Sequence, residues 1–553
     1  VLDFSRHVDA PAGKYGRVIV KNGKFVFENL PGKRVRFLGV NLCNSGDPFM
    51  TKELAETFAK RMARAGYNTV RLHHFENSLT AKNAKYSYEF DPEQLDRLDY
   101  LIYCLKKNGI YITYDLYCSR KIRKGELPDS GDFKAGVCFF DSYRENWKEF
   151  TRRLMNHVNP YTKIRWADDP VFYCLNLVNE NPLINTWNRG CEKAVLERYG
   201  EWLKRNRLDS EANRKTRTGV FLRFLEEMQS QTIRWMTDFI RKEIGSEILI
   251  ADVNCGGSNG DNIYLMRSRN LLDVVDNHSY NDHPDHPHGG WAPPAVFTQR
   301  SSIAAMGWVF RRIMPTRIFG KPFIVTEYCF VHPNRYLAEQ GPLTGACSAL
   351  QDWDGLVCFQ YAWSHRIVRS ETEYSTGSGY FDTLTNPVKR LSDYITWFLF
   401  IRGDVRSAPS GAALAMETLP WESRNVPDTF SVLGLVEQIG VLPTGKRMKN
   451  VRIVKPPFSD SSRTRFVSSS GEIILDTAPE LKVITPKSEC ITTDRPASAA
   501  KVLSFRGGGT FQTLSLHSLD NLPLEQSGSL LLFQLADTKN TAEKFSAPDM
   551  TYL

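Results

Sequence analysis

Two glutamates in this chain stand near the ends of apolar segments. Glu180 follows residues 171–178, and Glu327 lies within residues 321–330. Both segments are rich in Val, Leu, Ile, Phe and Tyr, which is typical of strands buried on both faces of a parallel sheet. The carboxyl ends of such strands are where barrel enzymes keep catalytic groups. Either Glu alone could be a solvent-facing strand end, but the pair could supply the proton donor and the nucleophile that cleave an acetal.

Further polar residues fall at the ends of other apolar segments. Arg71 and Tyr280 are the types that would keep Glu327 ionised. Asn179 could hydrogen-bond the 2-hydroxyl of a sugar, and Trp363 could form the floor beneath its ring. The same strand ends also present the following polar residues: Asn41, His73, His74, Tyr114, Asp115, Asp252, Asn254 and His278.

Two of these positions have competing interpretations. His73 and His74 are neighbours on a strand, so we expect them to face opposite ways, with one reaching the cleft and the other packing. Asp115 could pair with a neighbouring barrel residue or touch the substrate, and the sequence leaves both readings open.

The elements that would position these side chains alternate along the chain. A helical pattern at 51–66 has Thr51 as its cap, and Asp91-Pro92 opens another helix that Gly109 closes. Long helices are also predicted at about 219–244 and 387–402. Such alternation predicts a (β/α)8 TIM barrel. The predicted strands are 35–42, 68–74, 111–116, 171–180, 247–254, 274–280, 322–330 and 355–364.

Changes in this sequence pattern along the chain predict three domains. Residues 1–34 contain a β-hairpin with Asn22-Gly23 in its turn and are expected to cap the barrel, which spans 35–404. A charged insertion at about 183–218 leaves the strand end that carries Glu180, so it could form a cleft wall or a contact in a homo-oligomer. Short strands and Ser/Gly/Pro turns in 405–553 predict an antiparallel β-sandwich accessory domain.

Amino-acid composition limits the possible binding partners and locations of the protein. The net charge of +9 is spread over 553 residues without a dense Lys/Arg run, so nucleic acid is not expected. No run of about 18 apolar residues occurs, so no membrane span is expected. The 11 cysteines include no CxxC pair, which supports neither a zinc ribbon nor a disulfide framework. Reduced thiols favour the cytoplasm, whereas polysaccharide breakdown slightly favours a secreted or periplasmic location.

Taken in order, these residues resemble the retaining glycoside hydrolases of clan A, especially the cellulase-like family 5. The resemblance covers roughly residues 35–402 and rests on Arg71, Asn179-Glu180, His278-Ser279-Tyr280, Glu327 and Trp363. It implies that Glu180 is the acid/base, that Glu327 is the nucleophile, and that the substrate is a β-linked oligosaccharide or glycoside. It also implies no metal or cofactor. One departure is that Tyr114-Asp115 stands where family 5 usually carries a His.

Two rival functions remain. A non-catalytic carbohydrate-binding barrel would need the loss of one of the two glutamates, and both are present in this chain. A metal-dependent barrel hydrolase could use His283, His286 and His288, although the prolines in that loop favour a sugar subsite. Trp291, in the same loop, could stack on a second sugar or pack on the barrel. The sequence does not indicate the sugar, the linkage or exo versus endo action.

Overall fold

The computed structural model describes most of the chain, namely residues 2–43, 47–127, 131–216, 218–256, 263–289, 295–362, 379–421, 426, 428–456, 458, 462–507, 509–538 and 551–552. An eight-stranded sheet occupies its centre, with neighbours in the order β8-β7-β6-β5-β4-β12-β11-β9. All of its pairings are parallel. Its strands are β4 (Phe37–Leu42), β5 (Thr69–Leu72), β6 (Tyr111–Asp115), β7 (Phe172–Asn176), β8 (Leu249–Ala251), β9 (Val275–Asn281), β11 (Phe323–Phe330) and β12 (Gly355–Cys358).

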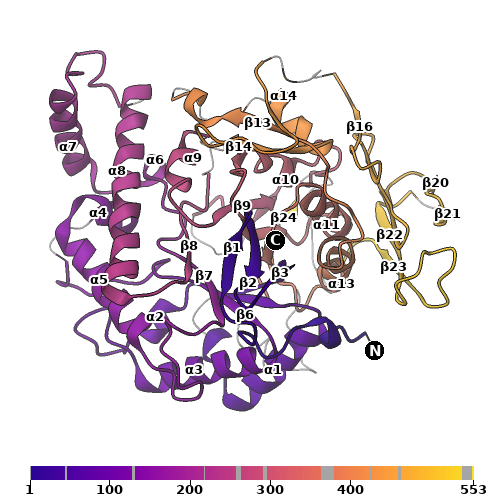
Figure 1. Ribbon diagram of the computed structural model, residues 1–553, viewed down its shortest axis with the longest axis horizontal. Helices are drawn as coiled ribbons and strands as arrows, with labels where there is room; N and C mark the ends of the chain where they lie inside the picture. Colours follow the sequence, from indigo (N-terminus) through magenta and orange to yellow (C-terminus); the bar gives the residue numbers. More distant parts are fainter. Residues whose placement is uncertain are drawn as a thin grey trace.

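The sheet curls into a nearly closed barrel, which confirms the predicted (β/α)8 fold (Figure 1). At the seam between β8 and β9, the amides of Asp273 and Val274 donate to the carbonyl oxygen of Ile250. Each predicted strand coincides with an observed one, because strands covered by helices must be apolar on both faces. The surrounding helices are α1 (Lys52–Arg64), α3 (Pro92–Lys107), α5 (Asp141–Asn156), α8 (Gly219–Asp238), α9 (Met266–Arg269), α10 (Trp308–Arg311), α11 (Gln340–Leu350) and α13 (Pro387–Thr396).

The predicted capping residues start these helices. The Asp91 side chain accepts from the amides of Glu93 and Gln94, with Pro92 in the first turn of α3. Thr51 caps α1. Two helices continue as π-helical turns, at Phe239–Ile244 after α8 and at Trp397–Ile401 after α13. Shorter helices in the barrel loops are α2 (Glu76–Leu79), α4 (Phe133–Phe139) and α6 (Leu183–Thr186).

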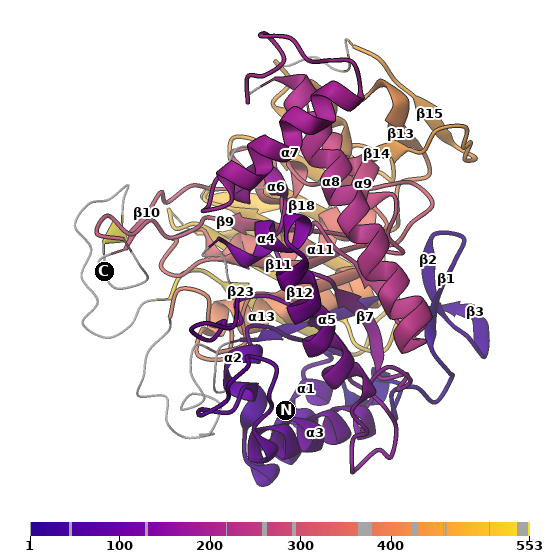
Figure 2. The same ribbon diagram turned by 90° about the vertical axis from the view of Figure 1, so that its left-hand side faces the viewer.

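The N-terminal hairpin lies against the end of the barrel where the strands begin. Strands β1 (Val18–Lys21) and β2 (Lys24–Phe27) pair around Asn22-Gly23, and β3 (Leu30–Arg34) adds a third strand. Phe25 contacts Phe37 and Tyr173 near the starts of two barrel strands. Asp352 accepts from Lys24, Arg34 and Arg36. Figure 2 shows this hairpin on the opposite side of the barrel from β10 (Val296–Phe297) and β24 (Thr551–Tyr552).

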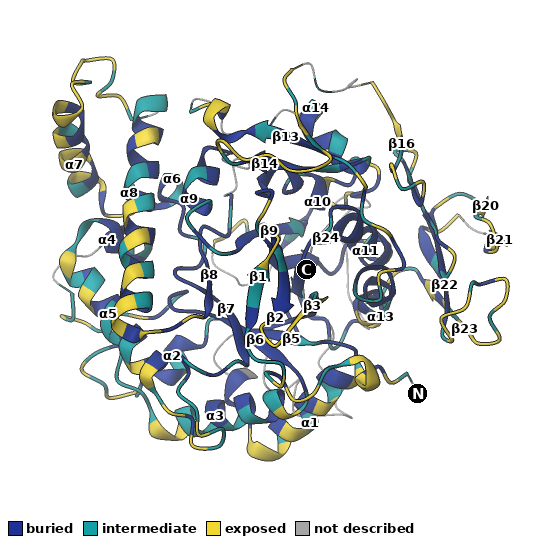
Figure 3. Ribbon diagram, in the orientation of Figure 1, coloured by how far each residue is buried: buried dark blue, intermediate teal, exposed yellow. Residues whose placement is uncertain are grey.

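The predicted insertion carries α7 (Glu192–Arg205), which packs on α8 through Tyr199 and Phe221. Its outward face is exposed in Figure 3. Whether this insertion forms a cleft wall or an oligomer contact stays a prediction, as do the domain boundaries. In the described part of the chain, no helix combines the length and apolarity that a bilayer span requires.

The C-terminal region has two sheets of different kinds. A parallel sheet contains β13 (Gly411–Ala415), β14 (Gln438–Leu442) and β15 (Val451–Ile453), with α14 (Asp428–Ser431) beside it. The predicted antiparallel strands follow, but they form one sheet over α11 and α13, and a sandwich is not confirmed among the described residues. They are β16 (Arg465–Val467), β17 (Ile473–Asp476), β18 (Glu480–Ile484), β19 (Ser488–Thr493), β22 (Gln512–Ser518) and β23 (Leu530–Leu535), beside the pair β20 (Ala497–Ala499) and β21 (Ser504–Arg506).

Candidate active site

The carboxyl ends of the barrel strands bring the two predicted glutamates together. Glu327 lies within β11, and Glu180 lies four residues beyond the end of β7, with a left-handed φ of 48°. One oxygen of Glu180, one oxygen of Glu327 and one ring nitrogen of His278 all lie within 4.8 Å of one another. This spacing is far closer to the roughly 5–5.5 Å of retaining glycosidases than to the roughly 6.5–9.5 Å of inverting ones.

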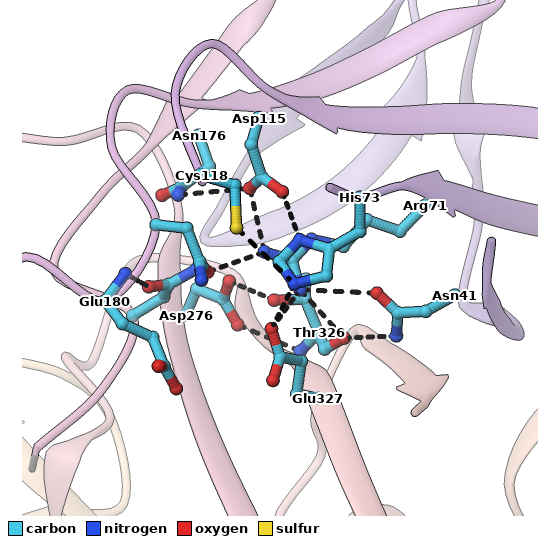
Figure 4. Close-up of polar contacts among 12 residues, drawn as sticks. Asn41, Arg71, His73, Asp115, Cys118, Asn176, Glu180, Asp276, Thr326 and Glu327 are labelled. Carbon is cyan, nitrogen blue, oxygen red and sulfur yellow. Dashed lines mark hydrogen bonds and ion pairs between the residues drawn. The ribbon is translucent and has the colours of Figure 1, made fainter. Parts of the chain in front are cut away.

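Glu327 is surrounded by hydrogen-bond donors (Figure 4). Its Oε1 accepts from Arg71 Nη1 at 2.7 Å, and its Oε2 accepts from Tyr280 Oη at 2.5 Å. His73 Nε2 lies 3.3 Å from Oε1. Burial raises the pKa of Glu327, but the charges of His278, His73 and Arg71 outweigh burial, so its pKa is lowered overall. Glu327 is therefore held as a carboxylate.

Arg71 joins three strand ends. Its Nη2 donates to Asp115 Oδ1 and to Asn179 Oδ1, both at 2.8 Å, while Nη1 binds Glu327. The planar guanidinium is suited to such forked contacts, and here it is fully buried. Asn179 Oδ1 also accepts from Asn254 at 3.1 Å. The amide oxygen of Asn179 is thus bound to protein, and its NH₂ group is the part that could meet a sugar hydroxyl.

The prediction that His73 and His74 face opposite ways is wrong. Strand β5 ends at Leu72, and His74 adopts a left-handed φ of 52°, so strand alternation no longer applies. The two ring centroids lie 4.1 Å apart. His73 Nδ1 contacts Asp115 Oδ2 at 2.5 Å, so Asp115 has the pairing role that the sequence left open.

Glu180 pairs with His278. Glu180 Oε1 lies 3.0 Å from His278 Nδ1, and its side chain is 37% exposed, compared with 5% for Glu327. Burial raises the pKa of Glu180, but the hydrogen bond and charge of His278 lower it further, so the net shift is downward. Conversely, burial lowers the pKa of His278, but Glu327 and Glu180 raise it above its usual value. In the free site, the proton of this pair lies mainly on His278.

Sequence reasoning missed the residues that hold His278. Its Nε2 lies 3.0 Å from Thr326 Oγ1, and that hydroxyl lies 2.5 Å from Asp276 Oδ2. Asp276 is a buried carboxylate at the second position of β9, two residues before His278, and its run of polar residues Asp276-Asn277-His278-Ser279 in a barrel strand was the signal that could have identified it. Phe359, one residue past β12, was also missed, and its ring packs between those of Tyr280 and His73.

The other predicted residues are more peripheral. Trp363 and Trp291 lie outside the described residues. Asp252 is buried behind the site, where it accepts from the Val178 amide and from Asn181. Tyr114 packs outward on Trp166 and Phe172. His283 and His286 contact aromatic rings, and neither they nor His288 belong to a group of candidate metal ligands within the described ranges.

Comparison with known proteins gives distant matches, and no family model matches the chain. A mannan endo-1,4-β-mannosidase of rice (Oryza sativa subsp. japonica) is 24% identical over 199 residues, which is 34% of this chain and 42% of the rice protein. The chain thus matches less than half the length of that curated relative. The match agrees with the predicted resemblance to family 5.

Solved structures with similar folds include an endo-1,4-β-mannanase from Rhizomucor miehei, at 14% identity and a TM-score of 0.46, covering 69% of this chain and 99% of that one. A glycoside hydrolase family 5 mannosidase from the same fungus has 12% identity and a TM-score of 0.40, covering 70% and 98%. An exo-β-1,4-mannosidase from Opitutaceae bacterium strain TAV5 has 15% identity and a TM-score of 0.46, covering 79% and 74%.

Proposed function

We propose that this relative of the family 5 glycoside hydrolases is a retaining β-glycosidase, with Glu327 as nucleophile and Glu180 as acid/base. The observation that carries the proposal is the contrast between the two glutamates. Glu327 is buried under Arg71 and Tyr280 and kept ionised, whereas Glu180 is partly exposed and shares a proton with His278. An ionised nucleophile opposite a proton-bearing acid is what double displacement requires.

In the first step, Glu327 Oε2 or Oε1 attacks the anomeric carbon while the leaving oxygen takes a proton from Glu180. The proton reaches Glu180 Oε1 from His278 Nδ1, 3.0 Å away. In the second step, Glu180 accepts a proton from water, which then cleaves the glycosyl ester on Glu327. The NH₂ group of Asn179 is oriented by Arg71 and Asn254, and we assign it to the sugar's 2-hydroxyl.

For the substrate we propose β-mannosides. The support is the name of the rice relative, a mannan endo-1,4-β-mannosidase. A panel of aryl β-glycosides of mannose, glucose, galactose and xylose tests this choice, because the correct sugar should give the largest kcat/KM. A preference for another sugar would contradict the proposed β-mannoside substrate but would not affect the proposed mechanism.

The mechanism is tested by two alanine variants on an activated aryl glycoside. Glu327→Ala should abolish turnover, and azide should restore it with an α-glycosyl azide product, because the small anion replaces the missing carboxylate. Glu180→Ala should retain glycosylation of this substrate, since a good leaving group needs little protonation. If the two variants behave identically and azide rescues neither, the roles are wrong. If the wild-type protein binds these sugars without cleaving them, the barrel is a binding module.

A further inference from the structure

A second cavity lies beside the mouth of the barrel, in the loop that follows β6. It has a volume of about 410 Å³, which lies within the range of small-molecule sites. Arg120 and Arg123 contribute to its wall, and the described residues that line it include no Asp or Glu. The wall of this cavity is therefore positively charged and suited to an anionic ligand.

Two contacts join the wall of this cavity to the catalytic site. The amide of Asn179, which directly precedes Glu180, donates to the carbonyl oxygen of Tyr117 at 2.8 Å. In the same loop, Ser119 Oγ lies 2.6 Å from His74 Nδ1. Because the loop is attached to two strand ends of the catalytic site, a substrate of several sugar units could occupy both places.

Arg120 is held in the wall by groups that do not neutralise it. Its Nη2 donates to Asn146 Oδ1 at 2.8 Å and its Nη1 donates to the hydroxyl of Ser87, and both partners are uncharged. The side chain is 2% exposed, and its Nε has no hydrogen-bond partner among the described residues. Burial lowers the pKa of Arg120, so the acids around it do not fully offset the loss of water. An anion in the cavity would supply the missing compensation.

Arg123 is also without a carboxylate contact. Its Nη2 donates to the carbonyl oxygen of Ala81 at 2.7 Å, and its Nε has no partner among the described residues. The acid of the same loop, Glu126, is occupied by the backbone. Both of its oxygens accept from the Ser87 amide at 3.0 Å, and its Oε2 accepts from the Arg123 amide at 2.7 Å. Two guanidinium groups thus remain available to one ligand.

The composition of the wall favours a sugar that bears a carboxylate. The planar fork of a guanidinium matches the two oxygens of a carboxylate. Tyr117, Phe133 and Tyr143 add rings to the wall, which suit the apolar face of a sugar. Lys121 and Lys124 are exposed on the same loop, and their charge attracts an acidic ligand. We propose that this cavity binds a hexuronate unit through its carboxylate.

This inference also specifies the substrate class. The hexuronate would be a second unit of the chain whose β-mannoside is cleaved between the two glutamates, so the substrate would be an acidic β-linked polysaccharide. Only this place in a substrate rests on the proposed glycosidase function, because binding of a hexuronate does not require cleavage.

Binding is tested by ligand-observed NMR titration of the full chain with the methyl glycosides of glucuronate, galacturonate and mannuronate. At least one should bind, and its uncharged methyl ester should not. Arg123→Ala should raise the Kd at least about tenfold, because it removes hydrogen bonds to a charged group. The matched control is Lys124→Ala, which removes one charge from the same loop but from a residue outside the wall, and it should change the Kd by about twofold at most at 0.15 M salt.

Three results would overturn the proposal. They are binding of none of the three hexuronates, equal binding of acid and ester, and an unchanged Kd in Arg123→Ala. Displacement of the hexuronate by an equal concentration of inorganic phosphate would show a simple anion site and would also overturn it.

The place of the hexuronate in the substrate is tested with a glucuronate-substituted β-mannan and the same polymer after reduction of its carboxyl groups. Wild-type protein should show the higher kcat/KM on the acidic polymer, and Arg123→Ala should reduce this preference at least about tenfold. The ratio of two rates from one sample does not depend on how much of the variant is folded. An equal preference in both proteins would overturn the substrate assignment. If the chain cleaves no glycoside, the titration still decides whether the cavity binds hexuronates.

Discussion

The hydroxyl of Tyr280 offers the sharpest test of how the site controls Glu327. Tyr280 Oη donates to Glu327 Oε2 at 2.5 Å, and replacement by Phe removes this donor while keeping the ring against Phe359 and Phe381. A hydrogen bond to a charged group contributes about 1.5–3 kcal/mol. We therefore expect Tyr280→Phe to lose about one to two decades in kcat/KM.

The same loss should appear in the pH profile. A donor to the ionised carboxylate lowers its pKa, so its removal should raise the pKa of Glu327, by at most about one to two units if the whole contact favours the ionised form. Because Glu327 must be ionised to attack, the acidic limb of kcat/KM should move to higher pH.

The control for this measurement is Tyr328→Phe. Tyr328 follows Glu327 on β11 and points to the other face, where its buried hydroxyl has no hydrogen-bond partner among the described residues. This variant should keep the wild-type rate and acidic limb. An unmoved limb in Tyr280→Phe, or an equal shift in Tyr328→Phe, would refute the reasoning.

Further expectations concern the reaction and the scaffold. Proton NMR should show a β-configured first product from a β-glycoside, and an initial α-anomer would exclude double displacement. Lysine at position 71 cannot reproduce the forked contacts of Arg71. Because each lost hydrogen bond to a charged group costs about 1.5 kcal/mol, Arg71→Lys should lower kcat/KM at least tenfold. A wild-type rate would contradict this expectation. Thr326 holds His278, which we propose supplies the proton for the leaving group. Thr326→Val should therefore lower kcat/KM more on glycosides with poor leaving groups than on activated glycosides, whereas equal losses would argue against a role of Thr326 in proton delivery. Burial raises the pKa of Asp352, but Lys24, Arg34 and Arg36 lower it overall. The ionised Asp352 should therefore add to the free energy of unfolding above its usual pKa of 3.8, and this contribution should be lost as the pH falls below that value. Urea midpoints of Asp352→Asn and wild type should therefore differ at neutral pH and converge in acid, and a constant gap would count against the ion cluster.

The sequence predicted the barrel because its signal is local. A strand covered on both faces must be apolar, and helices between such strands need caps, so elements such as Asp91-Pro92 and the segment ending at Glu180 could be recognised one by one, and their alternation along the chain predicted the barrel. The sequence carries no comparable signal for whether two strands pair parallel or antiparallel. Short strands such as β13 and β15 look alike whether they pair parallel or antiparallel, which is why the parallel sheet there was not predicted.

Side-chain direction at the strand ends was also beyond sequence reasoning. The two-residue alternation of a strand fails once the backbone leaves extended geometry, as at His74 with a φ of 52°. That change turns His74 towards His73 and Cys118 instead of away from them. Partners contributed by distant strands, such as Thr326 for His278, follow only from the closed barrel.

On the proposed roles, the charges of the site explain how Glu180 can be an acid despite its lowered pKa. Thr326 Oγ1 donates to Asp276, so it accepts from His278 Nε2–H, and this leaves Nδ1 to share one proton with Glu180 Oε1. Among the groups that raise the pKa of His278, Glu327 is the largest. As Glu327 bonds to the sugar its charge disappears, so the pKa of His278 falls at that moment. The proton is then released through Glu180 to the leaving oxygen as the nucleophile reacts. Glu180 is left ionised, which is the state it needs as a base for the water of the second step.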